Sequence, residues 1–287
     1  MISRANLIRI GILGALIGLV LFTSFENKRQ DGLLKVYFFD VGQGDAIFIQ
    51  APNGRQVLVD GGPNNTVLQN LSKAMSPKDR NIDVVLLSHP HADHVSGLVD
   101  VLDRYQINYI VQAKENYDSS EFRAWQDAVS RENAIEIEAI AGKVFDLGMG
   151  ARLTILHPAN SAAGITTDDP HKHMVVVQLE YGDAKILLTG DMEADVERFL
   201  ASRINIRADV LKVGHHGSKT STSELFLNAV NPQAAVIQLG DKNRYGHPSK
   251  IVLDRLESLG IPYYRTDLQD NIELQTDGST IAITVKN

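Results

Sequence analysis

The chain has 287 residues, of which 44% are hydrophobic and 22% charged, and it contains no cysteine. This length suffices for one large domain or two small ones, and the lack of cysteine excludes disulfides and thiolate metal sites. The net charge of −7 argues against a broad basic face for long nucleic acid, although bound metal ions could supply positive charge locally for a phosphodiester.

The N-terminus carries an uncharged apolar run of 16 residues, 10–25, preceded by Arg4 and Arg9. A helix of this length rises about 24 Å, which is short for a membrane span but adequate when a flanking arginine reaches the interface. The basic flank favours an exported body. We expect a retained membrane anchor through residues 5–25, because no good cleavage site follows; a cleaved signal peptide and a buried helix stay open as alternatives. Residues 1–30 thus form the anchor or signal segment and a short polar linker.

The remaining body, residues 31–287, begins with three strand patterns separated by turn-forming glycine and proline. Later segments alternate between helical periodicity and buried-strand patterns. The predicted helices cover residues 65–75, 94–105, 119–133, 192–203, 223–230 and 249–260. The predicted strands cover residues 33–41, 45–52, 55–62, 83–89, 108–113, 135–141, 151–157, 174–182, 184–191, 208–213, 234–240 and two segments near the C-terminus. Two β-rich halves with helices outside indicate the α+β class and a four-layer αββα sandwich.

The segment HPHADH, residues 89–94, holds three of the nine histidines of the chain at the end of a predicted strand. His89 and His91 face the same way while the chain is extended, whereas Asp93 and His94 start a helix and face another direction. One rigid turn can thus supply ligands to two adjacent metal ions. Imidazole and carboxylate ligands without thiolate suit zinc, and also manganese or iron. The alternative is an ordinary polar loop capped by Asp93.

HPHADH resembles the H-x-H-x-D-H signature of the metallo-β-lactamase fold superfamily. More narrowly, six stretches across residues 33–285 resemble the hydrolase domain of the competence ComEC/Rec2 family, in the order of that family. They are FFDVGQGDAIFI, LVDGG, LLSHPHADHVSGL, VVVQLEYGDAKILLTGDME, VLKVGHHGSKTSTS and NRYGHPSKIVLDRL. Members of that family usually carry this domain after a multi-helix channel region, whereas this chain has one hydrophobic segment. The resemblance therefore implies the hydrolase, with the metallo-β-lactamase fold, and not the DNA-uptake pore.

The resemblance implies ligands for two divalent metal ions, zinc first and manganese second. These ligands are His89, His91, Asp93, His94, His173, Asp191 and His215. The first ion would take the two leading histidines of HPHADH, and the second ion would take Asp93 and His94, completed by His215. Asp191 would bridge both ions, with a helix N-cap as the alternative role. We interpret His216 as structural.

The third histidine for the first ion depends on the segment DPHKHMVVV, where ComEC-like members commonly show an asparagine-rich stretch. His171 and His173 both fall in this window. We favour His173, because it directly precedes a predicted strand, over His171, which follows Pro170. The remaining alternative makes both histidines solvated loop residues.

Five further positions are candidates for the same site or its surroundings. Asp60 in LVDGG resembles the early aspartate of the superfamily, which supports the histidine loop, and we expect that role over direct ligation. Asp40 and Asp45 either border the site or stabilise a turn. His247 in NRYGHP either donates to a phosphate oxygen or leaving group, or only starts a helix. His157 is interpreted as structural.

Two divalent ions about 3.5–4 Å apart can hold a hydroxide at neutral pH and stabilise attacking and leaving oxygens. This chemistry suits a phosphodiester, and equally an ester, lactone or β-lactam carbonyl. We expect a membrane-anchored or exported metal-dependent hydrolase, with its body outside the cytoplasm and Asp93, Asp191 and His247 in catalysis. Its expected activity is that of a phosphodiesterase or nuclease on a phosphodiester such as DNA. A secreted form, a carbonyl hydrolase and a non-catalytic DNA- or envelope-binding accessory module are the alternatives, and the sequence points to no protein partner.

Overall fold

The computed structural model of the chain describes residues 32–285, and the expected membrane anchor, residues 5–25, lies outside the described residues. Within residues 32–285, no helix is both long and apolar enough to cross a membrane. Within the described residues, the body from Leu33 onward forms one compact unit.

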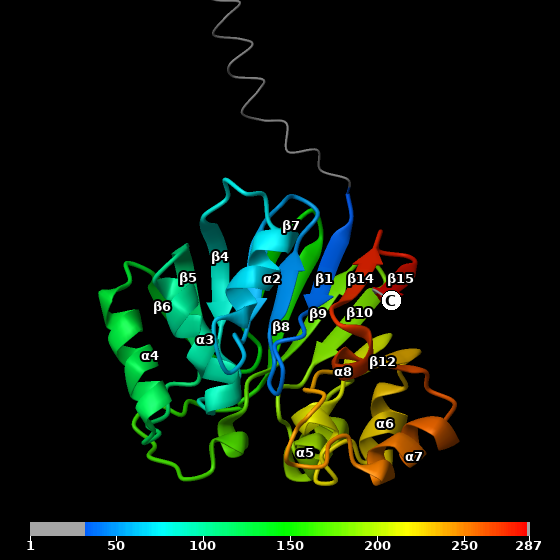
Figure 1. Cartoon of the computed structure of the whole chain (residues 1–287). Helices are drawn as coiled ribbons and strands as arrows, with labels where there is room; N and C mark the ends of the chain where they lie inside the picture. The colour runs from blue at the N-terminus through cyan, green and yellow to red at the C-terminus, as the bar shows by residue number, and fades with distance from the viewer. Residues whose placement is uncertain (1–31, 286–287) are drawn as a thin grey trace, which may run out of the picture. The chain divides into compact units, whose positions relative to one another are not determined.

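Two sheets make up the centre of this unit (Figure 1). The first sheet has the strand order β15-β14-β1-β2-β3-β4-β5-β6. Its strands are β1 Leu34–Phe38, β2 Ile47–Gln50, β3 Gln56–Val59, β4 Asn81–Leu86, β5 Gln106–Gln112, β6 Ile135–Glu138, β14 Ile272–Thr276 and β15 Ile281–Val285. The second sheet has the order β13-β12-β11-β10-β9-β8-β7. Its strands are β7 Val144–Gly148, β8 Ala151–His157, β9 Val176–Tyr181, β10 Ala184–Leu188, β11 Val210–Lys212, β12 Ala234–Ile237 and β13 Tyr263–Arg265.

Helices cover the outer face of each sheet (Figure 1). The first sheet carries α2 Thr66–Ala74, α3 Ala92–Leu102 and α4 Ser120–Arg131, and the second carries α5 Ala194–Arg203, α6 Glu224–Val230 and α7 Lys250–Ser258. Short helical segments are α8 Thr266–Gln269 and the 3-10 turns η1 Pro170–His173 and η2 Gly214–Gly217. The four layers confirm the predicted αββα sandwich.

Three buried apolar clusters hold these layers together. The cluster between the sheets joins Phe38 and Ile49 of the first sheet to Leu153 and Ile186 of the second. Strand β1 shows why the sequence forms this layer, since its residues alternate between buried and half-buried along the strand. Each outer cluster packs one sheet face against its helices, and in the first the fully buried Trp125 donates from Nε1 to the Gln112 side chain at 2.7 Å.

The parallel strands decide where functional side chains can gather. Strands β3, β4, β5 and β6 run parallel in the first sheet, and β10, β11, β12 and β13 run parallel in the second. The carboxyl ends of parallel strands meet at one edge of a sheet, which is where open α/β sheets bind ligands. Asp60 follows β3, HPHADH follows β4, Asp191 follows β10 and GHHG follows β11. The fold therefore brings all four segments to the same edge of the sandwich.

Candidate metal centre

The HPHADH loop leaves β4 and enters α3 with its first two histidines side by side. His89 Nε2 lies 3.0 Å from His91 Nδ1, and the two rings are 4.6 Å apart. A neighbouring loop presses closely on this turn, because a Cβ added at Gly44 would lie 2.1 Å from the carbonyl oxygen of Asp93. Gly44 has a φ of 136°, which only glycine adopts easily. The histidine loop is thus held from outside as well as by its own helix.

Asp60 supports the second half of this loop. One carboxylate oxygen of Asp60 accepts from the backbone N–H of Ser88 at 2.7 Å. The other accepts from the Ser88 hydroxyl at 2.7 Å and lies 2.9 Å from Nδ1 of His94. This contact leaves Nε2 of His94 for the centre of the site, the usual way in which an outer carboxylate orients a ligating imidazole. The geometry agrees with the supporting role expected for Asp60.

Asp191 occupies the middle of the cluster. Its Oδ1 lies 3.3 Å from Nε2 of His94 and 3.5 Å from Nε2 of His216. Its Oδ2 lies 4.0 Å from Nε2 of His89 and 3.7 Å from Nε2 of His215. The two oxygens therefore face two different sets of imidazoles, which is the arrangement that a bridging carboxylate needs.

The structure corrects the preference for His173 as the third histidine of the first set. The ligand atoms of His171, His89 and His91 lie within 4.8 Å of one another. His173 instead places Nδ1 2.6 Å from a carboxylate oxygen of Glu115 and belongs to no cluster of potential metal ligands among residues 32–285. Both histidines lie in the 3-10 turn η1, where the side chains of residues two apart point in directions about 120° apart, so only one can face the site.

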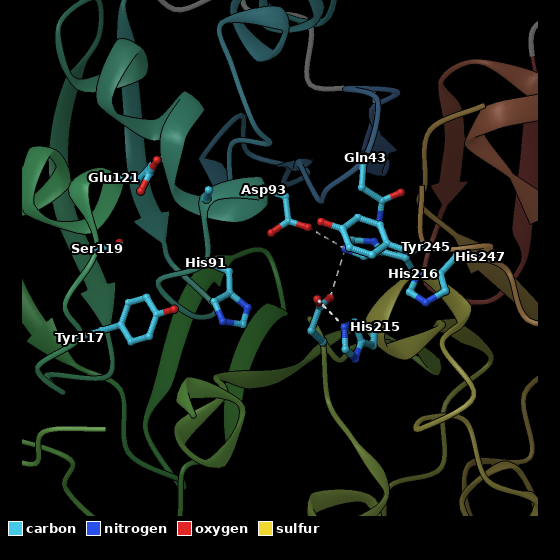
Figure 2. Close-up of a pocket in the computed structure, with 12 residues that line it drawn as sticks. Gln43, His91, Asp93, Tyr117, Ser119, Glu121, His215, His216, Tyr245 and His247 are labelled. Atoms are coloured by element: carbon cyan, nitrogen blue, oxygen red, sulfur yellow. Dashed lines mark ion pairs between the residues drawn. The ribbon is translucent and has the colours of Figure 1, made fainter. Parts of the chain in front are cut away.

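The histidine pair of η2 also departs from the prediction. His216 Nε2 lies 3.5 Å from Asp93 Oδ2, and His216 joins the ligand cluster of Asp93, His94 and Asp191. His215 instead clusters with His171 and Asp191. Both residues of the pair have left-handed backbone conformations, with φ of 48° and 52°, so that consecutive side chains both turn toward the centre (Figure 2). His216, interpreted above as structural, is therefore a candidate ligand of the second set.

The polar atoms at the centre fit divalent metal ions. Among residues 32–285, several buried ligand atoms have no hydrogen-bond partner, and four of them meet here: His94 Nε2, His171 Nε2, Asp191 Oδ1 and His216 Nε2. Leaving one such atom unsatisfied costs about 1–3 kcal/mol. Four in one place point to cations, and a set of nitrogen and oxygen donors without sulfur suits zinc or manganese. The described residues therefore include candidate ligands for divalent ions, and two of the candidate groups contain Asp191.

Burial and neighbouring imidazoles keep His89 and His91 neutral. Burial, reinforced by the neighbouring His94, holds the pKa of His89 well below its usual value. Burial and the nearby His171 lower the pKa of His91 to about 4. Burial alone would raise the pKa of Asp93, but its hydrogen bond with His216 and the nearby charges of His94 and His216 together outweigh burial and bring the pKa to about 2. Neutral imidazole and ionised carboxylate are the forms that bind metals.

Sequence reasoning missed two contributors that lie behind the ligands. The Lys212 side chain is fully buried and forms an ion pair with Asp45. Its ammonium donates to the carbonyl of Gly190 at 3.0 Å, while Asp45 Oδ1 lies 3.4 Å from Nδ1 of His216. A lone lysine inside the apolar run VLKV was the available signal. Glu193 was also missed, and its Oε1 lies 3.2 Å from Nδ1 of His215.

Of the remaining predicted positions, one lines the cavity and two make structural contacts away from it. His247 lines the cavity above the centre, with its ring 5.8 Å from that of His215. Asp40 stabilises a turn, because its carboxylate accepts from the N–H of Gly42 at 2.9 Å. His157 is structural, with Nδ1 2.7 Å from the carbonyl oxygen of Met174.

The cavity has a volume of about 390 Å³ and opens above the candidate metal ligands (Figure 2). Its floor is formed by His91, Asp93, Asp191, His215 and His216. One side of the cavity is lined by Tyr117, Ser119 and Glu121, and the other side is lined by Gln43, Tyr245 and His247 (Figure 2). A small or flexible substrate can thus reach the ligand cluster from solvent.

Comparisons with known proteins agree with this geometry. The family model of the metallo-beta-lactamase superfamily matches residues 39–241. The ComE operon protein 3 of Bacillus subtilis is 30% identical over 95% of this chain and 37% of its own length. Recombination protein 2 of Haemophilus influenzae is 31% identical over 86% of this chain and 30% of its own. The chain thus spans about a third of the length of these relatives, and the predicted resemblance to the ComEC/Rec2 hydrolase domain is confirmed.

Shorter and more distant similarities complete the comparison. Hydroxyacylglutathione hydrolase of Xylella fastidiosa is 38% identical over 55 residues, 19% of each chain. The crystal structure of the metallo-beta-lactamase fold protein YhfI from Bacillus subtilis has a TM-score of 0.52 and 13% identity, covering 80% of this chain and 95% of that one. The diiron β-hydroxylase CmlA of Streptomyces venezuelae has a TM-score of 0.52 and 14% identity, covering 85% of this chain and 54% of that one. At these identities the two structures show the fold alone.

Proposed function

The chain belongs to the metallo-beta-lactamase superfamily, and we propose that it is a phosphodiesterase or nuclease, a metal-dependent hydrolase with a dinuclear site. The observation that carries this proposal is the position of Asp191, whose two carboxylate oxygens face separate sets of imidazoles. His89, His91 and His171 would hold one ion. Asp93, His94 and His216 would hold the other.

When bound, two divalent ions lower the pKa of water and stabilise the attacking and leaving oxygens of an in-line displacement. The surrounding side chains of the protein orient the candidate ligands. Asp60 and Ser88 fix the ring of His94. The ion pair of Lys212 and Asp45 lies behind His216 and Asp191 and excludes water from that side, since both members are buried.

His247 is placed to act on the substrate and not on the metals. It is half-buried at the cavity wall, and its Nδ1 has no hydrogen-bond partner among residues 32–285. Burial and the nearby His216 lower the pKa of His247, so its imidazole is neutral at pH 7 and can donate its remaining N–H to a phosphate oxygen. We assign it that role in the proposed reaction.

The names of two long relatives favour a phosphodiester over a carbonyl substrate. These relatives are Recombination protein 2 of Haemophilus influenzae and Competence protein ComA of Neisseria gonorrhoeae, and recombination acts on DNA. The short similarity to hydroxyacylglutathione hydrolase makes ester-type hydrolysis the second candidate.

The test loads the full chain, purified in detergent, with zinc or with manganese. Hydrolysis of bis-p-nitrophenyl phosphate, single-stranded DNA and duplex DNA is compared with hydrolysis of a lactone and a β-lactam. We expect diester hydrolysis that needs metal. Efficient lactone or β-lactam hydrolysis without any diester hydrolysis would replace this proposal by the carbonyl-hydrolase alternative, and a stable protein that takes up no divalent ion would contradict both.

We also propose that residues 5–25 tether the body outside the cytoplasmic membrane. The support is the apolar run and the basic residues Arg4 and Arg9 before it. Protease added to spheroplasts should then degrade the body, whereas complete protection would contradict the tether.

A further inference from the structure

The loop between β12 and α7 holds an aromatic side chain beside the metal-ligating cluster. Asn243 stabilises this loop, because its Nδ2 donates to the carbonyls of Gly240 at 3.0 Å and His247 at 2.8 Å. Its Oδ1 accepts from the N–H of His247 at 2.9 Å. The loop is therefore shaped by its own hydrogen bonds before any ligand binds.

Tyr245 is the side chain that this loop presents. Its ring lines the cavity together with Asp93, Asp191 and His216, yet 55% of the residue is exposed (Figure 2). The ring lies nearly parallel to that of His247, with centroids 5.7 Å apart and an interplanar angle of 24°. An aromatic ring normally stabilises a protein by burial. A ring left this exposed contributes little to the fold and is available to a ligand.

The same loop carries two exposed basic residues next to the cavity-lining Tyr245, together with the exposed Asp241. The guanidinium of Arg244 lies 5.3 Å from the centroid of the Tyr245 ring, and Lys242 is exposed two residues earlier. The opposite side of the cavity carries Glu121. The loop thus offers a flat ring at the cavity and, beside it, a guanidinium that can contact a flanking phosphate.

We propose that Tyr245 is a specificity residue that stacks on a nucleobase next to the scissile phosphate, which makes unpaired nucleotide chains the substrate class. The proposal rests on the phosphodiesterase function proposed above. Stacking on an aromatic ring accepts every base, because each base has a π-face. A base within a duplex is already stacked on its neighbours, so Tyr245 can reach only unpaired bases. The cavity of about 390 Å³ suits one nucleotide and not a duplex.

The experiment compares two diesters that differ only in their bases, using the metal-loaded full chain. One is the dinucleotide of two thymidines, and the other is its abasic analogue with the same sugars and phosphate. The measured quantity is the ratio of their kcat/KM values. We expect the wild type to prefer the dinucleotide, and Tyr245→Ala to reduce that preference by about 5- to 150-fold, the range that loss of one stacked base gives. Tyr245→Phe should keep the preference, since it keeps the ring.

Tyr109→Ala serves as the matched control, because Tyr109 is also exposed, at 39%, but lines a different cavity. It should leave the ratio as in the wild type. A wild type without preference for the base-bearing diester, or an equal loss on both diesters in Tyr245→Ala, would overturn the stacking proposal. If the wild type cleaves neither diester, the phosphodiesterase proposal fails. In that case, isothermal titration calorimetry measures the affinities of the dinucleotide and its abasic analogue. The ratio of these affinities in the wild type and in Tyr245→Ala then tests stacking independently of hydrolysis.

Discussion

The ammonium of Lys212 lies 3.9 Å from Oδ1 of Asp191, and both side chains are buried. Lys212 also pairs with Asp45, which approaches Nδ1 of His216 to 3.4 Å. The carboxylate in the middle of the candidate metal centre is therefore backed by an internal ion pair. This pair connects the first sheet, where Asp45 precedes β2, to β11 of the second.

Removing the lysine should destabilise the protein strongly. Lys212→Met leaves the buried Asp45 without its cation, and breaking a buried pair from one side costs about 3–5 kcal/mol. The double variant Asp45→Asn with Lys212→Met removes both charges and should recover part of the loss. Urea unfolding of the metal-free protein measures both. The control is Lys250→Met, which removes a lysine whose side chain is 85% exposed and should leave the urea midpoint of unfolding unchanged. If Lys212→Met changes the midpoint as little as this control does, the ion pair does not stabilise the protein.

His171 should matter more for metal binding than His173. His171→Ala removes a ligand from the set with His89 and His91, so the affinity of the first ion should fall at least tenfold. His173→Ala should change it little, because the ring of His173 contacts Glu115. Competition of each variant with a chromophoric zinc chelator gives the affinities. Weaker binding in His173→Ala than in His171→Ala would restore the assignment made from the sequence.

His216 should complete the second set. His216→Ala is expected to retain one ion per chain and lose the other, because His216 Nε2 faces both Asp93 and Asp191. His215→Ala should keep two ions, since His215 clusters with His171 and Asp191 only, and the first set still has His89, His91 and His171. Metal analysis after gel filtration counts the ions. Loss of an ion in His215→Ala with full occupancy in His216→Ala would reverse the two roles.

Glu115 should make stability depend on pH. Burial, with a smaller contribution from Asp169, raises the pKa of Glu115 from an ordinary 4.5 to about 8. The folded protein thus binds this proton more tightly than the unfolded chain, so the stabilisation is complete below pH 4.5 and is lost as pH rises through 8. Relative to Glu115→Gln, which stays neutral, the wild type should therefore lose stability between pH 5 and pH 8. Unfolding of both metal-free proteins across this range checks the sign, and a wild type that gains stability relative to Glu115→Gln as pH rises would contradict the raised pKa of Glu115.

Asp191 and His247 should differ in how their loss affects turnover. Asp191→Ala removes the carboxylate that faces both sets and should abolish both metal binding and hydrolysis. His247→Ala should keep its metals, because His247 belongs to no ligand cluster among the described residues, and should lower kcat by about 10²- to 10⁴-fold if its N–H acts on the substrate. Metal content and turnover of a model diester separate the two. Unchanged turnover in His247→Ala would make it a structural residue.

Local patterns sufficed for the layers of the fold and for the first half of the site. The αββα order follows from strand and helix periodicities, which are set by side chains within a few residues of each other. HPHADH can be recognised from sequence because its ligands lie within one turn. The roles of Asp60 and Asp191 came from the resemblance to the metallo-β-lactamase superfamily, and the apolar strand run before Asp191 agrees with that role, because the ends of parallel strands meet in space.

Tertiary structure alone decided the details on which the chemistry depends. His171 faces the site and His173 does not, because a 3-10 turn, and not an extended chain, carries them. Both members of the His215 and His216 pair turn inward because their backbones are left-handed, a conformation that the surrounding packing imposes and no pattern in GHHGS encodes. The Lys212–Asp45 pair joins residues from two sheets, 167 positions apart in the chain. Such a contact exists only after the sheets have packed, because the burial that makes it strong is itself a product of the fold.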